Sequence, residues 1–188
     1  MVAPAPQLHR DERLAALARR EVQFVVIGGM AAQLHGVSRS ARDLEICPAW
    51  RLENFRRLVT ALETVEARLK PDLEVRPSVE LLRETPVTRW RTHPGDLDVH
   101  LACTGKYGVP VGFSELAPRA LELVVAGAVV LVAPLEDLIS AMEYTNRDLE
   151  DDREALRQLR ALRTSGGSRA ETVAQPVSAE PPRRSSMR

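Results

Sequence analysis

The segment from residue 24 to residue 48, FVVIGGMAAQLHGVSRSARDLEICP, limits the folds open to this 188-residue chain more than any other segment. It opens with residues 24–27, a β-branched run that is typical of a buried strand. Gly28 and Gly29 follow directly, and residues 30–34 continue at helical spacing. A strand, a glycine pair and a helix start together place backbone N–H groups at a helix N-terminus, where anions bind.

The same segment ends in residues 42–46, RDLEI, which we expect to form a second strand. Side chains alternate between the two faces of a strand, so Asp43 and Glu45 share one face. Their Cα atoms are then roughly 6–7 Å apart, which lets their oxygens hold one Mg²⁺ ion or a pair of them.

A later stretch, residues 96–101, shows the same alternation and places Asp98 and His100 on one face. If the two strands are neighbours in a sheet, Asp43, Glu45 and Asp98 converge on one metal site beside the glycine pair. Mg²⁺ commonly takes one or two carboxylates together with substrate phosphates. The pattern therefore indicates phosphoryl or nucleotidyl transfer, whereas a lone strand histidine such as His100 is more often a hydrogen-bonded surface group.

The rest of the chain mixes helices and strands. We expect helices at residues 11–20, 53–68, 79–83, 114–120, 135–142 and 149–162, and strands at residues 87–91, 121–126 and 129–132. This mixture predicts an α+β fold in which a mixed β-sheet is flanked by helices. We expect a loose N-terminus at residues 1–10, one domain at residues 11–163, and a disordered tail at residues 164–188 that is rich in Ser, Gly, Pro and Arg.

Composition narrows the setting. Lys plus Arg and Asp plus Glu number 26 each, so net charge gives no global argument for a nucleic-acid partner. Only two cysteines occur, Cys47 and Cys103, which argues against a disulfide scaffold and for a reducing compartment. The N-terminal sequence lacks the apolar region of a signal peptide, and no apolar run is long enough to span a bilayer. We therefore expect a cytoplasmic protein without a membrane partner.

The motifs, in this order, resemble the small nucleotidyltransferases of the AbiEii type, which are polymerase-β-like transferases and include toxins of toxin–antitoxin pairs. The residues that carry the resemblance are Gly28, Gly29, Ala31, Ala32, His35, Gly36, Arg39, Ser40, Asp43 and Glu45. The likeness continues through GDLDV at residues 95–99, APLEDLISAME at residues 133–143 and NRDLEDD at residues 146–152. It covers about residues 20–163.

The resemblance implies a nucleotidyltransferase fold, two Mg²⁺ ions, and an NTP that donates a nucleoside monophosphate to a hydroxyl. It implies that Asp43 and Glu45 bind the metals and that Asp98 is the third carboxylate and the candidate base. The residues implied to contact the donor phosphates are Gly28, Gly29, Arg39 and Ser40. By the same analogy the acceptor is an RNA end, tRNA above all, and the protein is a toxin with an antitoxin protein as its partner.

Two departures from the family pattern leave alternatives open. Glu45 stands where the family usually has Asp, and its extra methylene moves the metal-binding oxygens by about an ångström. Glu143 stands where the family usually has a phosphate-binding Lys, a loss that Arg147 would have to compensate. The first alternative is a degenerate relative that binds a nucleotide or a partner protein without catalysis. The second is a transferase that modifies small molecules such as antibiotics at the same site.

Overall fold

The computed structural model describes residues 5–38, 41, 43–93, 95–125, 127–145 and 149–166, with side chains from residue 12 onward. In this part of the chain the helices are α1 (Ala5–Arg19), α2 (Gly28–Leu34), α3 (Leu52–Thr64), α4 (Val79–Glu84), α5 (Phe113–Leu116), α6 (Leu135–Thr145) and α7 (Glu150–Thr164). Short 3-10 turns form η1 (Lys106–Gly108) and η2 (Ala117–Arg119). The strands are β1 (Phe24–Ile27), β2 (Leu44–Pro48), β3 (Arg68–Leu69), β4 (Val87–Arg91), β5 (Leu97–His100), β6 (Cys103–Thr104), β7 (Pro110–Val111), β8 (Leu121–Val125) and β9 (Ala128–Val132).

Within the described residues, seven strands form one sheet in the order β3-β4-β5-β2-β1-β9-β8. The sheet is mixed, because β1 runs antiparallel to β2 and parallel to β9, while β2 runs parallel to β5. β6 and β7 pair separately as a small antiparallel hairpin. The predicted α+β class, a mixed sheet flanked by helices, is confirmed.

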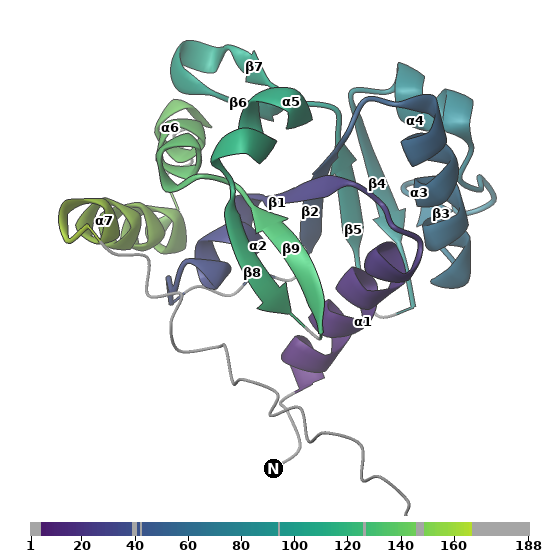
Figure 1. The fold of residues 1–188 in the computed structure, drawn as a ribbon, viewed down its shortest axis with the longest axis horizontal. Coiled ribbons are helices and arrows are strands. Elements are labelled where there is room, and N and C mark those ends of the chain that lie inside the picture. Colours follow the sequence, from purple (N-terminus) through teal and green to yellow (C-terminus); the bar gives the residue numbers. More distant parts are fainter. Residues whose placement is uncertain are drawn as a thin grey trace, which may run out of the picture.

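The helices form two groups on either side of the sheet, with α1, α3 and α4 in one group and α6 and α7 in the other (Figure 1). α3 is amphipathic and buries Phe55, Leu58 and Leu62 completely. These apolar residues recur every three or four positions, which is the pattern that predicts a helix with one buried face. Trp90 of β4 is also fully buried, and its indole N–H donates to the Thr88 hydroxyl at 2.8 Å. The sheet face opposite to this core is the one that carries the site.

Several element boundaries differ from the sequence pattern. α1 begins at Ala5 rather than at residue 11, and Pro6 is compatible with this start because proline is tolerated in the first turn of a helix. α3 ends at Thr64, four residues before the predicted end. β2 begins at Leu44, so Asp43 lies immediately before the strand rather than in it. The domain boundaries stay a prediction.

Candidate functional site

The turn between β1 and α2 is shaped by Gly28. Gly28 has a φ of +63°, a left-handed conformation that residues with a Cβ seldom adopt. A Cβ at this position would also overlap the carboxylate of Glu45, which lies against the Gly28 backbone. Gly28 therefore allows both the sharp turn from strand to helix and the close approach of an acidic side chain to that turn.

Glu45 and Asp98 lie side by side on neighbouring strands. In the parallel pairing of β2 with β5, Glu45 is the direct partner of Asp98. Paired strands are about 4.8 Å apart, and partners of this kind point to the same face. The structure thus brings together two of the three predicted carboxylates, and Asp43 precedes β2 as an exposed residue close enough to influence Asp98.

Electrostatics distinguish Asp98 from the neighbouring Asp96. Burial raises the pKa of Asp98, and the nearby charge of Asp43 raises it further, against the opposing effect of Arg89 and Lys70. The guanidinium of Arg89 is 3.4 Å from the Asp98 carboxylate. Asp96, by contrast, forms an ion pair with Lys70 and its carbonyl accepts from Arg13, so Asp96 has a structural role. Asp98 is therefore the better candidate for a base.

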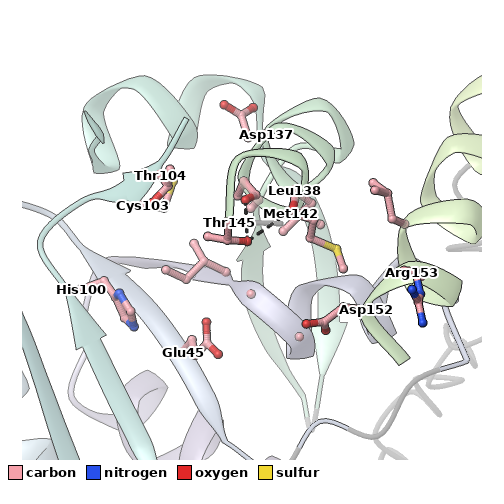
Figure 2. A pocket seen from close by; sticks show the side chains of 16 residues that line it. Glu45, His100, Cys103, Thr104, Asp137, Leu138, Met142, Thr145, Asp152 and Arg153 are labelled. Carbon is pink, nitrogen blue, oxygen red and sulfur yellow. Dashed lines mark hydrogen bonds between the residues drawn. The ribbon is translucent and has the colours of Figure 1, made fainter. Parts of the chain in front are cut away.

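A pocket of about 270 Å³ opens beside Glu45 (Figure 2). Its wall on the sheet side is formed by Ile27, Gly28, Gly29, Glu45 and His100, and its other walls come from β6, α6 and α7. Of the predicted site residues, Gly28, Gly29 and Glu45 line the pocket. Asp43 and Asp98 do not line it. Glu45 is consequently the link between the pocket and the carboxylate pair.

The pocket walls carry more negative than positive charge. Asp137 and Asp152 line the pocket together with Glu45, and Arg153 adds one positive charge. Asp137 is already balanced by Arg119, whose guanidinium donates to it at 2.7 Å. Sequence reasoning did not single out Asp152 as a site residue. The acidic first turn of α7 was the available signal, and packing of α7 against α6 brings this turn to the pocket.

Glu143 does not oppose a phosphate in the way the family comparison suggested. Its carboxylate accepts from Arg160 of α7 at 2.7 Å, and it is not among the described residues that line the pocket. Its charge is therefore balanced by an ion pair with α7 rather than presented to the pocket. The predicted phosphate contacts Arg39, Ser40 and Arg147 lie outside the described residues.

His100 differs from the hydrogen-bonded surface group that the sequence pattern favoured. It follows Asp98 by two positions on β5 and lines the pocket. Its Nε2 atom is buried and has no hydrogen-bond partner among the described residues. Burial lowers the pKa of His100, and the charge of Arg89 lowers it further. The ring nitrogens of a surface histidine hydrogen-bond to water. Nε2 of His100 lacks both water contact and a described protein partner, which is rare for a buried polar atom.

Glu45 and Asp98 could bind Mg²⁺ together with the phosphates of a substrate. No group of three or more His, Cys, Asp or Glu side chains within the described part of the chain is arranged to hold a metal ion by itself. The adjacent Glu45 and Asp98 instead match the common arrangement in which one or two carboxylates hold Mg²⁺ and phosphate oxygens and water complete its shell. Asp43, which lies beside Asp98, is available as a further ligand.

Three solved structures share this architecture. The antibiotic-resistance factor ANT(2'')-Ia in solution superposes with a TM-score of 0.54 at 18% identity, over 87% of this chain and 85% of its own. Its crystal structure with adenylyl-2''-tobramycin gives 0.51 at 17% identity, over 85% and 95%. The lincomycin-bound lincosamide antibiotic adenylyltransferase LnuA gives 0.53 at 12% identity, over 79% and 92%.

These similarities establish the fold. The chain has the nucleotidyltransferase fold, as the sequence resemblance implied. No protein-family profile and no curated protein matches the chain. None of the described helices combines the length and apolar character needed to cross a membrane.

Proposed function

We propose that this protein is a Mg²⁺-dependent nucleotidyltransferase that moves a nucleoside monophosphate from an NTP to a hydroxyl. The observation that carries the proposal is the direct pairing of Glu45 with Asp98 on the sheet face beside the Gly28 turn and the pocket. Paired carboxylates next to a strand–glycine–helix turn supply what phosphoryl-group transfer needs, namely a place for metal-bound phosphates and a base for the nucleophile.

Each residue has a defined part in the proposed reaction. Asp43, Glu45 and Asp98 would hold Mg²⁺, of which we propose two ions, and this metal would supply neutralisation of the negative charge on the phosphates. Asp98 accepts the proton of the acceptor hydroxyl, whose oxygen forms a bond to the α-phosphorus while the bond to the pyrophosphate oxygen breaks. The raised pKa of Asp98 makes it a stronger base than an ordinary carboxylate.

The triphosphate lies along the backbone of Gly28 and Gly29 in this proposal. These two glycines line the pocket beside Glu45, whose carboxylate lies against Gly28. A phosphate there would meet backbone next to that carboxylate, and Mg²⁺ would offset the repulsion between the two negative groups. Arg39, Ser40 and Arg147 are proposed to contact the same phosphates. Arg153 lines the pocket on the α7 side, where it also forms an ion pair with Glu150 at 2.9 Å.

A basic strip beside Asp98 supports an RNA acceptor, tRNA above all. The strip consists of Arg68, Arg89 and Arg91, which share one face of β3 and β4 because Arg68 pairs with Arg91 and Arg89 pairs with Asp98. Like charges on directly opposed positions are unfavourable without a partner, and a phosphate backbone would be such a partner. On the sequence resemblance alone, we also propose the AbiEii-type role, a toxin with an antitoxin partner.

A small-molecule acceptor is the second candidate. It is favoured by the acidic lining of the pocket, where Glu45 and Asp152 would attract a cationic amine-bearing molecule. ANT(2'')-Ia carries adenylylated tobramycin and LnuA binds lincomycin in the structures that share the fold. Loss of catalysis is the third candidate, because Glu45 replaces the usual Asp.

One set of reactions separates the three candidates. The purified chain is incubated with Mg²⁺ and each α-labelled NTP in turn, with total tRNA, tobramycin or lincomycin as the acceptor. We expect label in tRNA and none in the two antibiotics. Label in an antibiotic alone would replace the RNA proposal with the small-molecule one. NTP binding without transfer to any acceptor would favour a degenerate protein.

A further inference from the structure

The two ends of the pocket differ in chemistry (Figure 2). His100, Cys103 and Thr104 lie at one end, and Asp152 and Arg153 of α7 lie at the other, with Glu45 between them. The first end offers neutral polar groups and the second offers charged ones. A ligand that fills the pocket must therefore present different chemistry to its two ends.

The orientation of a bound NTP follows from this difference, and the inference rests on the proposed function. The α-phosphate must lie near Glu45, because the transferred group reacts beside the carboxylate pair. The β- and γ-phosphates then extend along Gly28 and Gly29 towards the end where Arg153 lies beside Asp152. Arg153 forms an exposed ion pair with Glu150 at 2.9 Å, and it would exchange this partner for a phosphate oxygen. The sugar, which is attached to the α-phosphate on its other side, is directed to the end formed by His100 and Thr104.

His100 has an unmet hydrogen-bonding need at that end. Its Nε2 atom is buried, so bulk water does not satisfy it, and no partner exists for it among the described residues. In Figure 2 the imidazole ring is turned towards the side of the pocket where Glu45 lies. Buried polar atoms are almost always hydrogen-bonded in native proteins. A group of the ligand that enters the pocket is thus the natural partner of Nε2.

We propose that Nε2 of His100 hydrogen-bonds to a ribose hydroxyl of the donor nucleotide and makes the protein selective for ribonucleotides. A hydroxyl both donates and accepts, so it matches either tautomer of the imidazole ring. A phosphate oxygen only accepts and belongs at the opposite end of the pocket. Thr104 lines the same end, so its hydroxyl is a second candidate contact for the sugar.

The test compares ribonucleotides with their deoxy forms. The full chain is titrated by calorimetry with Mg²⁺ and each of the four ribonucleoside triphosphates, and the tightest binder is compared with its 2'-deoxy and 3'-deoxy forms. We expect one deoxy form to bind about 10-fold more weakly, as is typical when a buried partner loses its hydrogen bond. In His100→Leu the ribonucleotide should weaken about 10-fold, to the level of that deoxy form.

Two further variants exclude a general disturbance of the fold. His100→Gln keeps a hydrogen-bonding group near the position of Nε2, so it should retain part of the ribose preference. His93→Leu removes an exposed histidine of the β4–β5 connection and should leave the preference unchanged. Thermal unfolding of each variant checks that the chain is folded during the titration.

The possible failures are distinguishable. If the wild-type chain binds ribonucleotides and both deoxy forms equally, the role of His100 is wrong while the nucleotidyltransferase proposal stands. The same conclusion follows if His100→Leu keeps the wild-type preference, for example because His100 contacts the base. If no triphosphate binds at all, the proposed function fails together with this inference.

Discussion

Glu45 of β2 is the direct parallel partner of Asp98 of β5, and the carboxylate of Glu45 occupies the space that Gly28 leaves open by having no side chain. One strand pairing and one glycine thus place two acidic groups side by side, and one of them, Glu45, lines the pocket. Like charges so close together are unfavourable unless a cation or a proton is present. The arrangement costs stability and is expected to be retained for function.

Replacing Asp98 by Asn should stabilise the chain in the absence of metal. The folded-state pKa of Asp98 is raised, chiefly by burial and also by Asp43, so its ionised form lowers stability at pH values above that pKa. The penalty disappears as the pH falls and the carboxyl becomes protonated. The melting temperature of Asp98→Asn should therefore exceed that of wild type at pH 7, and the two should converge in acid. A lower melting temperature at pH 7 would show that the ion pair with Arg89 dominates instead.

Gly28→Ala should lose both stability and nucleotide binding. Alanine at this position meets an unfavourable positive φ, which costs about 1–2 kcal/mol, and in addition collides with the Glu45 carboxylate. Gly127→Ala is the matched control, since Gly127 also has a positive φ but nothing lies within 4 Å of its Cβ position. Urea unfolding should show a clearly larger loss for Gly28→Ala than for Gly127→Ala. Equal losses would mean that Glu45 moves aside without cost.

The charge of Glu45, rather than its shape, should determine metal-dependent binding. Glu45→Gln keeps the size of the side chain but removes the charge, so triphosphate binding in the presence of Mg²⁺ should fall about 10-fold or more. Glu45→Asp keeps the charge and should retain Mg²⁺-dependent binding. Calorimetry with and without Mg²⁺ measures both effects. Unchanged binding in Glu45→Gln would remove this residue from the metal site.

Removing the basic strip should weaken RNA binding without affecting the nucleotide. The double substitution Arg68→Ala and Arg91→Ala deletes two of its three charges and leaves the Arg89–Asp98 ion pair in place. It should lower the affinity for tRNA and reduce the salt dependence of binding by about two contacts. Arg56→Ala and Arg163→Ala, on the exposed faces of α3 and α7, serve as controls of equal charge. Filter binding over a range of salt concentrations gives both quantities. An identical salt slope for the two double variants would exclude the strip.

Both cysteines should be nearly unreactive at neutral pH. Burial raises the pKa of Cys47 to about 12, with a further contribution from Cys103. Burial likewise raises the pKa of Cys103 to about 11, with Asp137 adding to the effect. The thiolate is the reactive form, so alkylation should be slow at pH 7.5 and should still increase above pH 9. A rate plateau near pH 8.5 would contradict this.

The local sequence was enough to predict some elements fully. The β-branched run Phe24–Ile27 and the alternating stretch Val87–Arg91 have the predicted bounds, because burial on one or both faces dictates their composition. β3, with only Arg68 and Leu69, could not be foreseen, since its two residues become a strand only by pairing with β4. The start of α1 was also missed, because proline near a helix start resembles a loop.

The site was predictable in its parts but not in its assembly. Asp43, Glu45 and Asp98 stand out by their alternation with apolar residues, yet nothing local specifies that β2 pairs with β5 in parallel. His100 was recognisable only through its buried, unpartnered nitrogen. The acidic turn of α7 reaches the pocket through long-range packing against α6, which sequence periodicity does not report.

The most direct test of the central claim is label transfer by wild type and by two Asp variants. With Mg²⁺, an α-labelled NTP and total tRNA, the wild-type chain should transfer label and release pyrophosphate. Asp98→Asn should reduce the rate by at least about 100-fold, because it removes the base and a metal ligand. Asp151→Asn, an exposed change on α7, should act like wild type. Transfer by Asp98→Asn at the wild-type rate would contradict the claim that the Glu45–Asp98 pair performs nucleotidyl transfer.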